Sequence, residues 1–202
     1  MSDRDEPSRE ESFLTGRILV AMPGIGDPRF ERAIIYVCAH DADHALGLTL
    51  NRPMDSLRLP DVLKQLGVPS SLEPPGAPVL LGGPVHRDSG FVLHTDDYVS
   101  RPPPDGDAAT LRIGDGVALT ATRDVLEAMA SVHSGPRRAV LALGYAGWGA
   151  GQLEQELREN VWLTCDADED LLFDADFDHK WSRALAKLGI HPEHLSVAAG
   201  RA

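Results

Sequence analysis

The sequence is poor in cysteine and has no long apolar segment, and each absence excludes a class of protein. Its two cysteines, Cys38 and Cys165, are too few for a disulfide framework, and both lie in short apolar runs that predict small buried side chains. No apolar segment approaches the about 18 residues that a membrane-spanning helix needs. The first residues, MSDRDEPSREESF, are charged and lack the apolar stretch of a signal peptide. We therefore expect a cytoplasmic protein with no membrane segment.

Positive charge is also scarce. The chain has 19 lysines and arginines against 31 aspartates and glutamates, which gives a formal net charge of -12. A polyanion such as DNA would meet a net repulsive field, so binding it would need a local basic patch. The densest basic cluster is the pair Arg137 and Arg138, and no helix-turn-helix signature is present. The composition therefore disfavours nucleic acid as a partner.

The hydrophobic pattern predicts a single α+β domain over residues 13–190. Residues 1–12 are polar and charged and predict a disordered arm, and the tail 191–202 is expected to be loose. Helical patterns are few and scattered, whereas strand patterns are frequent, which favours a mixed or largely antiparallel sheet over a doubly wound one. The apolar runs of strand length lie at 16–23, 33–39, 46–50, 90–95, 116–122, 137–145 and 161–165, and the second and third of them predict a hairpin.

The segment GYAGWGAGQLEQELRENVWL, residues 144–163, has four glycines before a predicted helix but matches no phosphate-binding motif. A dinucleotide fingerprint would need its third glycine where Gln152 or Glu154 stands, and the P-loop lysine is missing. Glu154 and Glu156 would also repel a phosphate from the helix N-terminus. We interpret the glycines as a tight turn between strand and helix that needs positive φ and close backbone approach, with Trp148 packed beside it. The alternative is that Trp148 forms the floor of a ligand pocket.

Two segments contain metal-ligand residue types without the spacing of a metal site. HDADH, residues 40–44, predicts a turn and has no defined remote ligand, although zinc sites usually need one. DADEDLLFDADFD, residues 166–178, has Leu171 and Phe177 where a calcium loop needs glycine and glutamate. We expect Asp168 to cap a helical turn instead, and we assign neither a metal nor a cofactor.

Two predicted strand ends have the chemistry of a binding site. Asn51 and Arg52 end a buried strand at a proline, where backbone pairing must stop. Arg52 can bind an anion through two hydrogen bonds, or it can hold the turn by clamping a loop carboxylate or carbonyl. Gly82 and Gly83 precede another proline at the end of a second strand, where they permit an unusual turn. If the two ends lie together, they form a shallow polar groove.

Taken together, four segments resemble the YqgE/AlgH family of bacterial proteins. They are GRILVAMPGIGDPRFERAIIYVCAHDADHALGLTLNRP, PVLLGGPVHRDSGFVLHT, LALGYAGWGAGQLEQELRENVWL and LLFDADFDHKWSRALAKLGI. They follow the family's order and cover nearly all of residues 16–190. The resemblance implies a compact α+β fold with a coiled, mixed sheet in the bacterial cytoplasm. It implies no accepted enzymatic activity and no catalytic residues, and some members carry the label of transcriptional regulator.

These observations favour a non-enzymatic binding or regulatory module whose partner is a protein or a small anionic ligand. Arg32 and Arg52 would contact the anion, and Trp148 would form an apolar wall. One alternative is a hydrolase or transferase for a small phosphorylated or acylated metabolite, with His40 or Asp41 as base; direct DNA binding is a third reading, disfavoured by charge. The residues expected to form the binding surface are Arg32, His40, Asp41, Asn51, Arg52, Gly82, Gly83 and Trp148.

Cys38 is the best candidate for a nucleophile, although a buried core cysteine is the favoured interpretation. His40 follows two residues later, which places both side chains on one face if the strand is regular.

Overall fold

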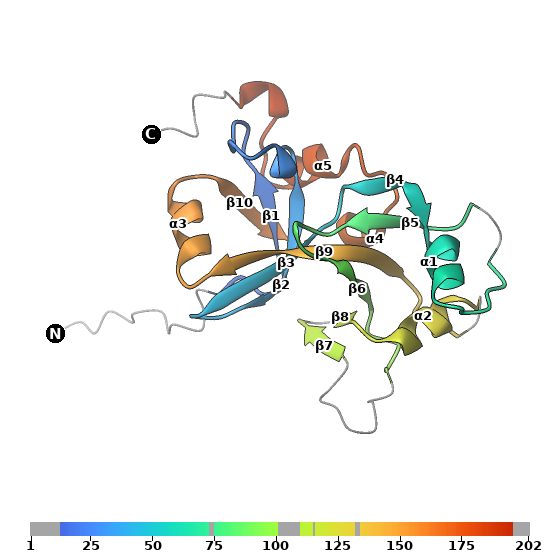
Figure 1. The fold of residues 1–202 in the computed structure, drawn as a ribbon. Coiled ribbons are helices and arrows are strands. Elements are labelled where there is room, and N and C mark those ends of the chain that lie inside the picture. Colours follow the sequence, from blue (N-terminus) through green and yellow to red (C-terminus); the bar gives the residue numbers. More distant parts are fainter. Residues whose placement is uncertain (1–12, 73–74, 101–109, 115, 132–133, 196–202) are drawn as a thin grey trace.

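The computed structural model describes residues 13–72, 75–100, 110–114, 116–131 and 134–195 (Figure 1). The expected disordered arm 1–12, the proline-rich loop 101–107 and the end of the tail lie outside the described residues, so the proposed domain limits stay predictions. The strands are β1 (Arg17–Ala21), β2 (Ile34–His40), β3 (His44–Thr49), β4 (Pro53–Arg58), β5 (Pro78–Leu81), β6 (Val85–Thr95), β7 (Thr110–Ile113), β8 (Val117–Thr120), β9 (Ala139–Gly149) and β10 (Trp162–Asp166). The α-helices are α1 (Leu59–Gln65), α2 (Arg123–Met129), α3 (Gln152–Arg158), α4 (Glu169–Phe173) and α5 (Lys180–Lys187).

The strands form a curled sheet in the order β10-β1-β2-β3-β9-β6-β8-β7, with β4 and β5 joined to it through β9. The pairing of β5 with β9 is parallel, and the described neighbours otherwise run antiparallel. This confirms the predicted α+β class with a coiled, mixed and largely antiparallel sheet. The predicted hairpin is β2 and β3. None of the helices in the described part of the chain is both long and apolar enough to cross a membrane.

Strand β9 joins the two halves of the sheet and crosses the middle of the molecule (Figure 1). Its first half pairs with β5 and β6, and its last residues pair with β3. The strand continues to Gly149, so the glycines from Gly144 onward do not form the predicted turn, but Gly144 has the expected positive φ of 70° and the expected close backbone approach. The turn comes later, where Gly151 has a left-handed φ of 70° directly before α3.

Alternating side chains of the sheet are buried on both faces. In β1 and β2, Leu19 and Ile35 pack in one cluster with α3, whereas Ile18 and Ile34 pack in another with α4 and α5. A third cluster places α1 and α2 on β5, β6 and β9. Because successive residues of a strand point to opposite faces, a continuous apolar run such as AIIYVCA requires cover on both sides, and the helices provide it.

The short helix α4 has a polar residue at each end that satisfies its free backbone groups. Asp168 accepts a hydrogen bond from the Leu171 N–H at 2.8 Å, which confirms the predicted cap. At the other end, Lys180 is fully buried, and its Nζ donates to the carbonyls of Leu171 and Leu172 at 2.7 and 3.2 Å. Its ammonium also lies 5.5 Å from the centre of the Phe177 ring. Burial lowers the pKa of Lys180 from 10.5 to about 8.

The lowered pKa of Lys180 predicts a pH-dependent stability. Since the unfolded chain holds this proton more tightly than the folded chain, the contribution of Lys180 to the free energy of unfolding increases as the pH rises above about 8. We expect the difference in unfolding free energy between the wild type and Lys180→Met to grow between about pH 7.5 and 9.5, measured by urea denaturation. The subtraction cancels Tyr36 and Cys38, whose pKa values burial raises. A difference that stays constant over this range would contradict the assignment.

Two glycines form a matched pair for testing the close approach of β9 to the chain after β5. A Cβ on Gly83 would lie 2.1 Å from the carbonyl carbon of Tyr145, whereas a Cβ on Gly149 would meet no atom within 4 Å. We expect Gly83→Ala to destabilise the fold by at least about 1–3 kcal/mol because the backbones must separate. Gly149→Ala should change stability by no more than about 0.5 kcal/mol. Urea denaturation of both variants measures the difference, and equal losses would refute this explanation.

Candidate functional site

The two predicted strand ends lie side by side, joined by backbone hydrogen bonds. The Leu81 N–H donates to the Arg52 carbonyl at 2.8 Å, and the Thr49 N–H donates to the Gly82 carbonyl at 2.8 Å. Gly82 in turn donates to the Leu143 carbonyl of β9 at 2.8 Å. The end of β3, the end of β5 and the middle of β9 therefore meet at one place in the sheet.

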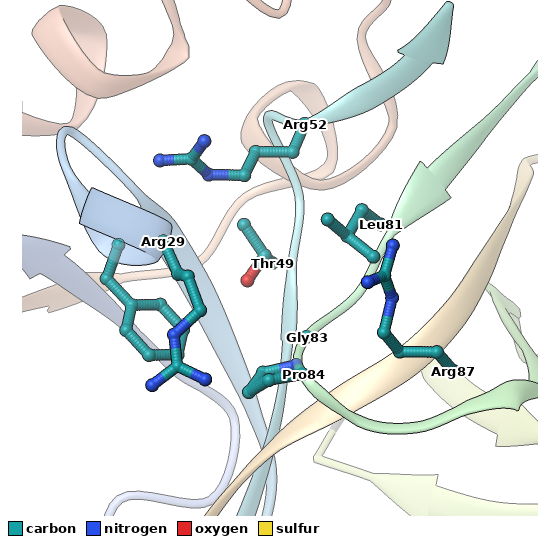
Figure 2. A pocket seen from close by; sticks show the side chains of 8 residues that line it. Arg29, Thr49, Arg52, Leu81, Gly83, Pro84 and Arg87 are labelled. Carbon is teal, nitrogen blue, oxygen red and sulfur yellow. The ribbon is translucent and has the colours of Figure 1, made fainter. Parts of the chain in front are cut away.

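A cavity of about 370 Å³ lies at this junction. In Figure 2, Arg29 and Arg87 stand on opposite sides of Thr49, Arg52 lies above it, and Gly83 and Pro84 lie below. We call this cavity the arginine pocket, and its lining residues are Arg29, Phe30, Thr49, Arg52, Leu81, Gly83, Pro84 and Arg87.

The three guanidinium groups of the arginine pocket have different partners. Arg29 forms an ion pair with Asp27 at 2.7 Å, and its hydrogen bonds hold the pKa of that carboxyl below the ordinary value. Nη2 of Arg52 donates to the Glu31 carbonyl at 2.8 Å, so the predicted clamp on a loop carbonyl is present. Its Nε is buried, and the part of the chain that the structure describes offers it no hydrogen-bond acceptor. Arg87 is exposed, and no ion pair joins it to the described residues.

Thr49 adds a hydroxyl to the arginine pocket. The residue is buried, with 1% of its surface exposed, and Figure 2 shows its hydroxyl oxygen between Arg29 and the Gly83–Pro84 turn. Its backbone N–H donates to the Gly82 carbonyl at 2.8 Å, which holds the residue on the wall of the pocket.

The sequence reasoning missed Arg29, Thr49 and Arg87. A signal for the two arginines was present, because Arg29 follows Pro28 and Arg87 comes three residues after Pro84. Arg29 lies in the 3₁₀-helix Pro28–Phe30 between β1 and β2, and Arg87 lies near the start of β6. Thr49 carried no comparable signal, since a threonine is ordinary in a strand.

The predicted residues Arg32 and Asn51 lie beside Arg52 on a second, shallower cavity of about 420 Å³. Asn51 has a structural role there, because its Oδ1 accepts the Ile34 N–H at 3.0 Å and its Nδ2 donates to the Arg32 carbonyl at 2.8 Å. Arg32 has a left-handed φ of 52°, and its guanidinium lies 5.5 Å from the ring centre of Trp181. These contacts fix the chain before β2 and the loop that carries Glu31.

His40 and Asp41 lie at the turn of the β2–β3 hairpin and do not line the arginine pocket. Nδ1 of His40 accepts the Leu14 N–H at 3.0 Å, and Nε2 contacts Glu154 Oε1 at 2.9 Å. Both ring nitrogens are therefore engaged. Asp41 accepts two backbone N–H groups of its own turn, as turn-forming aspartates do.

Cys38 and His40 do not form a pair. The register of β2 against β3 shifts between Val37 and Ala39, and such a bulge reverses the alternation of side chains. Cys38 therefore packs in the cluster with α4 and α5, whereas His40 contacts Glu154 of α3 on the other face. The expectation of a shared face is therefore wrong. The Cys38 thiol is a core side chain, and burial raises its pKa.

Gly82 and Trp148 complete the predicted set. Gly82 is buried, and a Cβ there would lie 2.3 Å from the Gly144 carbonyl oxygen. Its role is therefore to let the backbone after β5 approach the backbone of β9. Trp148 lies in β9 outside the arginine pocket and lines an adjoining cavity of about 290 Å³. Its Nε1 donates to Glu156 Oε2 at 2.9 Å. The structure thus brings Arg52 and Gly83 into one pocket and places Trp148 in the next.

The protein is therefore a small α+β protein with a curled sheet, and a cavity of ligand size lies where its strand ends meet. Residues 18–193 match the AlgH-like family, and the chain belongs to that family. It is 64% identical over 190 residues to a UPF0301 protein of Caulobacter vibrioides, with 94% of each chain covered. It is 50% identical to a UPF0301 protein of Bradyrhizobium diazoefficiens, over 97% of this chain and 92% of the relative.

Two solved structures resemble this fold. The solution structure of the AlgH protein from Pseudomonas aeruginosa is 39% identical, with a TM-score of 0.70 and 94% of each chain covered. A crystal structure from Corynebacterium diphtheriae is 19% identical, with a TM-score of 0.63 over 91% of this chain and 88% of the other, which shows the same fold alone. None of the names of these proteins states a biochemical activity.

Stability measurements should separate Asn51 from the exposed arginine of the pocket. Asn51→Ala leaves the N–H of the fully buried Ile34 without its acceptor, which should cost about 1–3 kcal/mol. Arg87→Ala removes no hydrogen bond and should change stability by about 0.5 kcal/mol or less. Urea denaturation tests both; a larger loss for Arg87→Ala would make Arg87 a structural residue and remove it from the site.

Proposed function

We propose that this chain is a non-enzymatic binding protein of the bacterial cytoplasm that takes a small anion, a carboxylate or a phosphate, in the arginine pocket. Ligand binding would regulate its contacts with other proteins. The pocket volume of about 370 Å³ lies within the range of small-molecule sites, about 300–1,000 Å³.

The observation that carries the proposal is the unpaired Nε of Arg52. A buried donor without an acceptor costs about 1–3 kcal/mol, and such groups are rare in folded proteins. The other end of this guanidinium is held by the carbonyls of Glu31 and Pro28. An oxygen of an anion in the pocket, reached by a small rotation of the side chain, would supply the missing acceptor. Arginine suits this role because its planar fork matches carboxylate and phosphate oxygens.

The local charge supports the same ligand class. The chain as a whole has a formal charge of -12, yet three guanidinium groups line this one cavity. Asp27 neutralises Arg29, which leaves Arg52 and Arg87 to attract an anion. The Thr49 hydroxyl on the pocket wall would add a hydrogen-bond donor, so the pocket would offer charge and hydrogen bonds from several directions.

The enzymatic alternative has less support. Its proposed base, His40, has both nitrogens engaged by Leu14 and Glu154, and its hairpin turn does not line the arginine pocket. A general base must be within hydrogen-bond reach of the proton that it removes. Direct DNA binding is disfavoured by the charge of the chain, since the pocket arginines are too few for the many phosphate contacts on which nucleic-acid affinity depends.

Calorimetric titration with inorganic phosphate and with succinate tests the proposal. We expect saturable binding of at least one of the two anions to the wild type. Arg87→Ala should weaken it by about tenfold or more, since a hydrogen bond to a charged group contributes about 1.5–3 kcal/mol. The matched control is Arg112→Ala, which removes an exposed arginine of β7 that is paired with Asp96. This variant should leave binding unchanged. Absence of binding, or equal effects of the two variants, would contradict the proposal.

A further inference from the structure

A second cavity of about 290 Å³ adjoins the arginine pocket, because Arg29, Phe30 and Pro84 line both. The second cavity has a different character. We call it the tryptophan cavity, and its further lining residues are Ile25, Asp27, Ala146, Gly147, Trp148, Gln152, Glu156, Val161 and Trp162.

Glu156 is the unusual group of the tryptophan cavity. Its Oε2 accepts the indole N–H groups of Trp148 and Trp162 at 2.9 and 2.7 Å. Its Oε1 accepts the Gln152 amide at 2.9 Å. These donors are all neutral, and no ion pair joins Glu156 to a cation in the described part of the chain. Because a carboxylate oxygen can accept two hydrogen bonds, Oε1 keeps one position for a further donor.

The walls around this carboxylate suit a cation. The Trp148 and Trp162 rings meet edge to face with centroids 6.1 Å apart, and Phe30 meets Trp162 in the same way at 5.8 Å. Aromatic surfaces attract ammonium and guanidinium groups. The other carboxylate of this cavity, Asp27, is already paired with Arg29. Glu156 is therefore the negative charge without a counter-ion.

We infer that the ligand is zwitterionic, with its anionic group in the arginine pocket and an ammonium or guanidinium group in the tryptophan cavity, joined by a short chain past Phe30 and Pro84. This inference rests on the proposed function for its anionic end. The arginine pocket and the tryptophan cavity would together bind amino acids whose side-chain amine lies some distance from the carboxylate, and similar zwitterions. Simple dicarboxylates would fit less well.

The test compares linear carboxylates that differ at the far end. Butanoate, hexanoate and octanoate are titrated against the wild type beside their ω-amino and ω-hydroxy derivatives. At one chain length, the amino derivative should bind at least about fivefold more tightly than the hydroxy derivative, the advantage expected for a cation at an aromatic site. This comparison uses the wild-type protein and so does not depend on the folding of a variant.

Glu156→Gln should abolish the advantage of the amino group while preserving carboxylate binding, since glutamine can still accept the indole hydrogen bonds. The matched control is Glu159→Gln at the C-cap of the same helix. The Glu159 carboxylate is exposed and accepts the Gln155 amide, so this variant should keep the advantage. If carboxylates bind but the amino group adds nothing at any length, or its advantage survives in Glu156→Gln, this inference is overturned and the proposed function stands. If no carboxylate or phosphate binds, both are overturned.

Discussion

The close contact between β9 and the chain that follows β5 is the constraint on which the rest of the structure depends. Gly82, Gly83 and Gly144 let three backbones approach so closely that a Cβ at any of them would meet a main-chain atom at 2.1–2.6 Å. This contact joins the two halves of the sheet, since β9 pairs with β3 on one side and with β5 and β6 on the other. It also brings the ends of β3 and β5 together, and these ends carry Thr49, Arg52 and the turn before Arg87.

The same contact explains why the site is made of groups from several strand ends. The expectation that backbone pairing stops at Pro53 is wrong, because Pro53 begins β4 and pairs with Leu80 of β5. The residues between β3 and β4, and those between β5 and β6, nevertheless lie outside the strands. Some of the polar groups at these strand ends stabilise the loops, as the hydrogen bonds of Asn51 and of Arg52 Nη2 show. In the described part of the chain, Arg52 Nε has no hydrogen-bond acceptor and Arg87 has no ion pair, so the proposed ligand site rests on these two groups.

The sequence predicts the fold class well because apolar runs such as AIIYVCA and VWLTC record burial directly. It does not predict β4 or β7, whose residues are largely exposed and therefore lack a hydrophobic pattern. The sequence predicts the turn before α3 too early, near Gly144. A glycine that allows close backbone approach inside a strand cannot be distinguished by residue type from a glycine in a turn. The displacement of His40 from the face of Cys38 depends on a bulge, which leaves no mark on residue types.

The candidate site is predictable in part for a similar physical reason. An arginine beside a proline is visible in the sequence, so Arg52 and Gly83 could each be named as site candidates, but only the fold shows that they line one pocket. The pairing of Trp148 and Trp162 through Glu156 could not be predicted, because it depends on how α3 packs between β9 and β10. A local hydrogen-bonding function follows from residue type and neighbours, whereas a cavity wall built from distant elements follows from tertiary packing.

The central claim is that anions bind where Thr49, Arg52 and Arg87 meet. The most direct measurement is a titration of ¹⁵N-labelled protein with succinate and inorganic phosphate, followed by amide chemical shifts. The account predicts saturable shifts concentrated at residues 49–52 and 83–87, with the hairpin turn 40–44 unaffected. Shifts that never saturate, or that centre on the hairpin turn instead, would contradict it.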